Sequence, residues 1–114
     1  MREELIKLLD NCYSEIDKFK CSCIVVMNDG KKFNGVNIKN SIYRDSIYGE
    51  VSAITGAVSS GYKKGNFDSI YILTNNSNYY ICKEIIKEFF EDDKSVHIYT
   101  LDDNSEKTIK VGDL

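Results

Sequence analysis

Four cysteines and one histidine are the side chains of this 114-residue chain best suited to hold a metal or act as nucleophiles. Cys21 and Cys23 stand two residues apart in a segment rich in β-formers, where alternation places both side chains on one face of a sheet. Buried free thiols are therefore expected there, and zinc binding by either is the minor alternative. His97 lies in another apolar run, distant in sequence from the other candidates, and we expect it to be structural or solvent-facing.

The periodicity of apolar residues predicts the elements that must position these groups. Residues 3 to about 18 place their leucines and isoleucines on one helical stripe. A second helix, at residues 47 to about 61, contains Ala53, Gly56 and Ala57, which allow close approach to a sheet. The other expected elements are a third helix at residues 79 to about 91 and strands at residues 19–27, 32–38, 69–74, 96–101 and 108–111.

This order of elements, α-β-β-α-β-α-β-β, predicts an α/β fold. Strands separated by helices return by crossover connections, so we expect a three-layer α-β-α sandwich with a mixed five-stranded sheet. A chain of this length supports one hydrophobic core, and residues 1–114 are therefore expected to form a single domain.

Composition and charge exclude two classes of partner. The formal net charge of -3, with scattered lysines, argues against a nucleic-acid-binding protein. No apolar run approaches the roughly 20 residues needed to span a bilayer, and residues 1–11 resemble an amphipathic helix rather than a secretory signal. We therefore expect no membrane partner and a cytoplasmic location.

Three short segments carry a recognisable motif. Residues 35–43 read G-V-N-I-K-N-S-I-Y, residues 47–54 read I-Y-G-E-V-S-A-I, and residues 78–82 read N-Y-Y-I-C. Together they resemble the cytidine deaminase family, of the small cytidine deaminase and blasticidin S deaminase type. In that family a G-x-N-x-x-N-x-x-Y stretch precedes a Cys-Ala-Glu or His-Ala-Glu triplet, and a Pro-Cys-x-x-Cys run follows. The resemblance covers nearly the whole chain and implies the family's cytidine-deaminase-like sandwich.

The resemblance also implies a degenerate zinc site. In the family, one Cys or His and two Cys hold zinc, whose bound water attacks cytosine while a glutamate shuttles protons. Glu50 matches that glutamate, and a carboxylate that accepts N–H bonds in the first turn of a helix is an equal alternative. Cys82 matches the last ligand, although a packing role for this thiol is the stronger interpretation. Tyr48 and Tyr79 stand at the other two ligand positions, and a phenol with a pKa near ~10 ligates zinc poorly at neutral pH. No metal or cofactor is therefore expected, with zinc present only if the altered site still binds it.

Part of a nucleoside pocket is also implied. Phe19 matches an aromatic residue of the family's pocket, and Asn37 matches an asparagine that binds the sugar. Lys39 replaces the acidic partner of that asparagine, which would suit an anionic group such as a phosphate, although a solvated surface lysine is the simpler interpretation.

Three functions follow as hypotheses. The first is a catalytically inactive homologue that retains a pocket for a pyrimidine nucleoside or nucleotide. The second is an active zinc-dependent cytidine or deoxycytidine deaminase with an altered metal site, in which Glu50 is the proton shuttle. The third is a structural or interaction protein whose pocket is filled by Tyr48 and Tyr79. The resemblance further implies a homo-oligomer, either a dimer or a tetramer.

Overall fold

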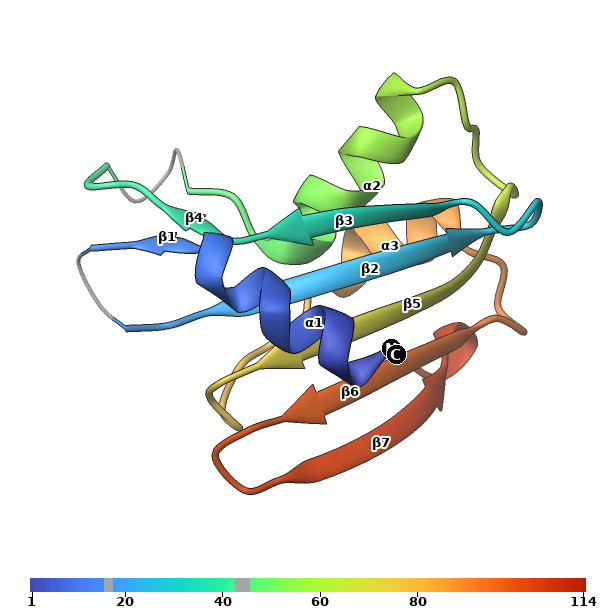
Figure 1. The fold of residues 1–114 in the computed structure, drawn as a ribbon. Coiled ribbons are helices and arrows are strands. Elements are labelled where there is room, and N and C mark those ends of the chain that lie inside the picture. Colours follow the sequence, from blue (N-terminus) through green and yellow to red (C-terminus); the bar gives the residue numbers. More distant parts are fainter. Residues whose placement is uncertain (16–17, 43–45) are drawn as a thin grey trace.

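The computed structural model describes residues 1–15, 18–42 and 46–114, and it is built around a mixed five-stranded sheet (Figure 1). The strand order is β3-β2-β5-β6-β7, with a parallel pair formed by β5 and β6 and antiparallel pairs elsewhere. The strands are β2 (Cys21–Met27), β3 (Lys32–Val36), β5 (Phe67–Thr74), β6 (Ser95–Thr100) and β7 (Ser105–Lys110). This sheet confirms the predicted α/β class.

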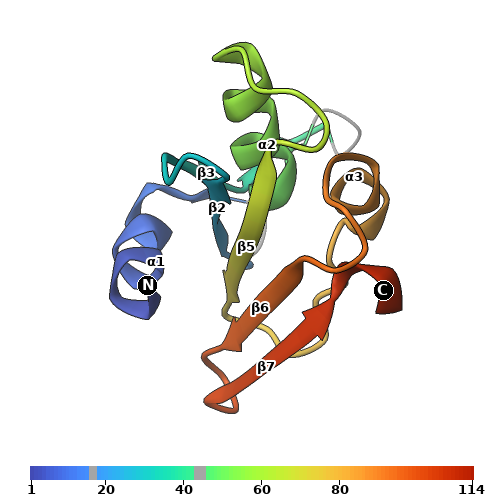
Figure 2. The same cartoon turned by 90° about the vertical axis from the view of Figure 1, so that its right-hand side faces the viewer.

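Helices cover both faces of the sheet. The helix α1 (Arg2–Leu8), continued by the 3-10 turn η1 (Leu9–Asn11), lies on one face. The helices α2 (Gly49–Ser59) and α3 (Lys83–Phe89) lie on the other face (Figure 2). A short parallel pair, β1 (Tyr13–Ser14) with β4 (Ile38–Lys39), extends beyond the sheet, and the 3-10 turn η3 (Val111–Asp113) ends the chain. No helix of the described residues is long and apolar enough to cross a bilayer.

Two hydrophobic clusters hold the layers together. The larger cluster lies between the sheet and α2 and α3, and it includes Cys21, Cys23 and Phe67 with no exposed surface. The smaller cluster packs Leu5 of α1 against Ile24 and other residues of the sheet. The strands β2, β5 and β6 contribute side chains to both clusters, so the inner strands of the sheet connect the two parts of the core.

Three expected boundaries were wrong by three residues or more. The first helix was expected to continue to residue 18, but it ends early because the Tyr13 N–H donates to the Asn37 carbonyl, 3.1 Å away, and begins strand β1; residues 16 and 17 lie outside the described residues. The third helix begins at Lys83 rather than at Tyr79, whose N–H closes a turn onto the Asn76 carbonyl. The last strand begins at Ser105, three residues before its expected start.

The α2 helix approaches β3 so closely that a side chain at Gly35 has no space. A Cβ atom at this position would lie 2.3 Å from the Gly49 carbonyl oxygen and 2.4 Å from the Ala53 amide nitrogen. Both are backbone atoms, so only a movement of the helix relieves the contact. The Gly35 backbone therefore sets the distance between α2 and the sheet.

We predict that Gly35→Ala destabilises the protein by about 1–3 kcal/mol or more, because it forces α2 away from β3. Gly56→Ala is the matched control, since a Cβ atom there meets nothing within 4 Å. The control should stabilise the protein by about 0.5–1 kcal/mol through its higher helix propensity. Urea unfolding of both variants measures the difference, and equal stabilities would contradict the close approach.

Candidate functional site

Glu50, in the first turn of α2, is a fully buried acidic side chain. Its Oε1 accepts a hydrogen bond from the Cys21 thiol, with a sulfur-to-oxygen distance of 3.3 Å. Its Oε2 accepts from the Tyr79 hydroxyl at 2.5 Å and from the Cys82 backbone N–H at 2.9 Å. Both carboxyl oxygens are therefore bonded to protein donors.

Three separate segments converge to supply these donors. Cys21 reaches the start of α2 because its neighbour there is a glycine: a Cβ atom at Gly49 would lie 3.2 Å from the Cys21 carbonyl oxygen. Cys82 is the N-cap residue of α3, where a backbone N–H lacks an intrahelical partner and is free to bond Glu50. Tyr79 comes from the loop that precedes α3. The carboxyl group thus joins α2, β2 and the start of α3.

The thiols of Cys21 and Cys82 and the hydroxyl of Tyr79 surround Glu50, and the pKa of each is raised. Burial, followed by the neighbouring Glu50, raises the pKa of the Cys21 thiol well above its usual value. The same two causes raise the pKa of the Cys82 thiol to about 12. The pKa of the Tyr79 hydroxyl is also raised far above the ordinary value of a phenol, first by burial and then by Cys21 and Glu50. At neutral pH these groups are neutral hydrogen-bond donors.

The three residues predicted to stand at the family's zinc-ligand positions lie in one region of the structure. Tyr79 bonds Glu50, Cys82 bonds the same oxygen through its backbone, and the Tyr48 ring lies 6.1 Å from the Tyr79 ring between centroids. Their donor atoms are two phenols and a single thiol, a poor set for zinc, which prefers several thiolate or imidazole ligands. Within residues 1–15, 18–42 and 46–114, no group of three or more His, Cys, Asp or Glu is arranged to hold a metal. The residues present do not fit the family's zinc.

A cleft of about 290 Å³ opens beside this network. The tilted rings of Phe19 and Tyr79 contact each other in its wall with centroids 4.9 Å apart, and the Lys39 ammonium lies 5.0 Å from the centroid of the Phe19 ring. The full lining is Phe19, Lys39, Tyr48, Asn76, Asn78, Tyr79 and Tyr80. The structure therefore brings two of the three predicted pocket residues, Phe19 and Lys39, to one aromatic cleft.

Asn37, the third predicted pocket residue, is fully buried and bonded to backbone. Its Oδ1 accepts from the Cys21 N–H at 2.7 Å, and its Nδ2 donates to the Phe19 carbonyl at 3.2 Å. The side chain fixes the segment that leads into β2, and through it the positions of Phe19 and Cys21. It does not line the cleft.

Cys21 is the site residue that sequence reasoning missed. Its thiol was expected to be a small buried hydrophobe, and a strand residue was not expected to reach the start of a helix. The residue is buried as expected, but it also donates to Glu50. The glycine at position 49 is the one signal in the sequence that α2 begins against another backbone.

We predict that Tyr79→Phe costs about 1–3 kcal/mol of stability, because it removes a donor from a buried carboxyl group. Tyr80→Phe is the matched control, since the neighbouring tyrosine is 91% exposed. The control should leave the free energy of unfolding within about 0.5 kcal/mol of the original. Equal urea midpoints for the two variants would show that the Tyr79 hydroxyl does not support Glu50.

Comparison with known proteins identifies relatives over most of the chain. Residues 1–98 match the family described as the cytidine and deoxycytidylate deaminase zinc-binding region. A cytidine deaminase of Mycoplasma genitalium is 28% identical over 98% of this chain and 87% of its own length. A cytidine deaminase of Mycoplasma pneumoniae is 31% identical over 81% of this chain and 71% of its own length.

Solved structures share the fold. The cytidine deaminase of Burkholderia pseudomallei superposes with a TM-score of 0.88 at 23% identity, over 97% of this chain and 90% of the other. The enzyme of Mycobacterium tuberculosis gives a TM-score of 0.77 at 14% identity, over 99% and 89% of the two chains. With the sequence match over residues 1–98, these findings show that the chain belongs to the cytidine and deoxycytidylate deaminase family.

Proposed function

We propose that this chain is a catalytically inactive homologue of cytidine deaminase that binds a pyrimidine nucleoside or nucleotide in its aromatic cleft. One observation carries the first half of the proposal. Glu50, at the position of the proton-shuttling residue, has both oxygens bonded to protein groups, and one donor is the tyrosine that stands at a zinc-ligand position.

The hydrogen bonds of Glu50 oppose a catalytic role. A general acid–base group must reach the reacting atoms of its substrate within hydrogen-bond distance. The Oε2 of Glu50 already accepts from Tyr79 and Cys82, and its side chain has no exposed surface. For Glu50 to contact a substrate, the Tyr79 ring would have to move out of the wall of the cleft. This movement would break the hydrogen bond from the Tyr79 hydroxyl to the Glu50 carboxyl group.

The lining of the cleft supports binding of a planar ring. Aromatic side chains stack on nucleobases, and each such contact contributes about 1–3 kcal/mol. Tyr80 borders the cleft with 91% of its surface exposed, so it presents an open face to a ligand. The amides of Asn76 and Asn78 supply donors and acceptors that match the edge of a pyrimidine.

The position of Lys39 favours a nucleotide over a nucleoside. Its ammonium lies against the Phe19 ring in the wall of the cleft, so a base stacked there brings its sugar and phosphate close to a positive charge. The ammonium group binds phosphate as a point charge. We therefore propose a pyrimidine nucleoside monophosphate as the preferred ligand.

Assembly of the chain as a dimer or tetramer is a further proposal. The paired strands β1 and β4 expose Tyr13 and Ile38, and Ile47 bridges to Ile38 beside them. These side chains are 51%, 41% and 40% exposed, respectively. An apolar group of this kind next to a cleft is suited to burial against a second copy of the chain.

We predict that the purified protein contains no stoichiometric zinc and releases no ammonia from cytidine or deoxycytidine. Tyr48→Cys with Tyr79→Cys is the positive control, because it supplies two further thiols beside Cys82. The double variant should bind about one zinc per chain, measured by elemental analysis. It should also lose about 3 kcal/mol or more of stability before metal is added, since two large rings are removed.

Stoichiometric zinc or ammonia release in the unaltered protein would instead support an active deaminase with an altered metal site. A double variant that folds but takes up no zinc would show that these positions do not match the family's ligands.

We predict that cytidine monophosphate binds about tenfold more tightly than cytidine, as measured by calorimetry at low salt. Lys39→Gln should remove this difference while leaving cytidine binding unchanged, and Lys63→Gln, at an exposed position outside the cleft, is the control. Tyr80→Ala should weaken both ligands, because it removes a stacking surface without disturbing the core. If neither ligand binds, the cleft has no nucleoside function and the tyrosine-filled structural protein is favoured.

A further inference from the structure

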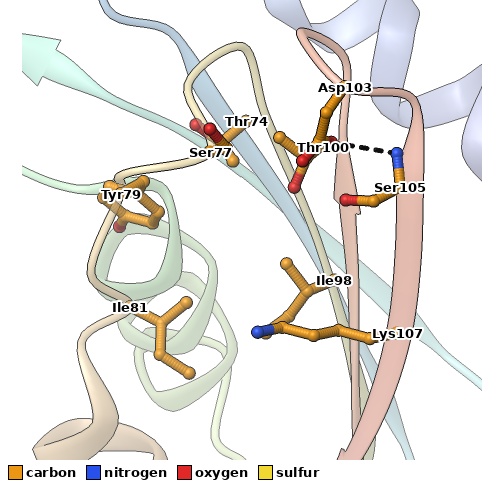
Figure 3. A pocket seen from close by; sticks show the side chains of 9 residues that line it. All are labelled: Thr74, Ser77, Tyr79, Ile81, Ile98, Thr100, Asp103, Ser105 and Lys107. Carbon is orange, nitrogen blue, oxygen red and sulfur yellow. Dashed lines mark hydrogen bonds between the residues drawn. The ribbon is translucent and has the colours of Figure 1, made fainter.

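A second pocket lies on the other side of the Tyr79 loop (Figure 3). It has a volume of about 160 Å³ and lies between residues 77–81 and the ends of β5, β6 and β7. Its lining residues are Thr74, Ser77, Tyr79, Ile81, Ile98, Thr100, Asp103, Ser105 and Lys107. Of these, Tyr79 alone also lines the aromatic cleft, so the pocket is a separate site.

The pocket wall carries hydrogen-bonding groups without protein partners. Thr100 is only 7% exposed, yet its hydroxyl makes no hydrogen bond within the described part of the chain. The Ser105 hydroxyl also makes no hydrogen bond within the described part of the chain, whereas the Ser77 hydroxyl interacts with the Asp102 carboxylate. No fully buried side-chain nitrogen or oxygen of the described residues lacks a hydrogen-bond partner, so the unpaired Thr100 hydroxyl is accessible from the pocket and can bond a molecule or water that enters it.

Two charged groups define what such a molecule must carry. The Lys107 ammonium extends from β7 past Ile98 into the pocket, and no ion pair or hydrogen bond engages it among the described residues. Asp103 uses Oδ1 to accept the Ser105 N–H at 3.1 Å, which leaves Oδ2 without a donor. The ligand therefore meets one cation, two unpaired hydroxyls and one carboxylate acceptor.

We propose that this pocket binds a small protonated oxyanion, with inorganic hydrogen phosphate as its ligand. The oxygens of the anion would accept hydrogen bonds from Lys107 and from the hydroxyls of Thr100 and Ser105. The remaining P–OH group of the anion would donate a hydrogen bond to the Asp103 carboxylate. A fully deprotonated anion lacks this donor and would be repelled by Asp103. The site is independent of the proposed nucleotide cleft.

This chemistry discriminates between similar anions. Sulfate has the same shape but carries no proton near neutral pH, so it leaves Asp103 facing a negative charge. A phosphate monoester has lost its second proton above a pKa of about 6, and it is disfavoured for the same reason. Hydrogen phosphate is thus the tetrahedral anion that satisfies both Lys107 and Asp103.

The experiment is an NMR titration of the full chain at pH 7.5 and constant ionic strength with inorganic phosphate, sulfate and methyl phosphate. Phosphate should shift the amides of residues 77, 100, 105 and 107 with a millimolar dissociation constant. Sulfate and methyl phosphate should bind at least about tenfold more weakly. Absence of phosphate-dependent shifts at about 50 mM, or equal binding of sulfate, would overturn the proposal.

Variants assign the contacts. Lys107→Met and Thr100→Val should each weaken phosphate binding about tenfold, whereas Lys110→Met, on the opposite face of β7, should not. Asp103→Asn keeps an acceptor for the Ser105 N–H and adds a donor, so it should make sulfate bind as tightly as phosphate. Lys107 is exposed, so its variant remains informative if Thr100→Val fails to fold. An unchanged phosphate affinity in Lys107→Met, or an unchanged preference in Asp103→Asn, would refute the site.

Discussion

A carboxyl group at the centre of a small domain must be given hydrogen-bond donors, and much of this structure follows from how Glu50 obtains them. The donors come from a strand thiol, a loop hydroxyl and the backbone at the start of α3. Unpaired, a buried carboxyl group would cost several kcal/mol or take up a proton. The position of α3, the loop before it and the close contact between Gly49 and Cys21 all serve this one requirement.

The same contacts shape both cavities of this region. The Tyr79 hydroxyl is held by Glu50, so its ring is fixed against Phe19 as a wall of the aromatic cleft. The other side of that loop closes the polar pocket near Thr100 and Lys107. A site in which Glu50 reached a substrate would need a different position for Tyr79, and both cavities would change with it. Under the proposed function, a ligand therefore binds in the cleft without acid–base chemistry at Glu50.

Sequence patterns predicted the layers of the fold but not the contacts between individual residues of distant segments. Apolar periodicity and the family motif predicted the mixed sheet, because side-chain spacing directly reflects which face is buried. The first helix was overextended because Tyr13 fits a helical stripe, yet its N–H is taken by the Asn37 carbonyl, a contact 24 residues away. The motif also placed Glu50, Tyr79 and Cys82 in one region. Neither the thiol of Cys21 nor the backbone role of Asn37 could be predicted, since each depends on the register between distant segments.

The presence of Glu50 beside two tyrosines has a physical explanation that does not require catalysis. In a zinc site the cation balances a neighbouring glutamate, so the loss of ligands alone would leave a buried negative charge without compensation. Here a phenol, a backbone N–H and a thiol supply three neutral donors in place of the cation. High pKa values keep the phenol and the thiol of Cys21 protonated, which preserves them as donors. Under the proposed function, Glu50 is a structural acceptor that joins α2, β2 and the start of α3, and the Tyr79 hydroxyl is the donor that would make its retention compatible with a site without metal.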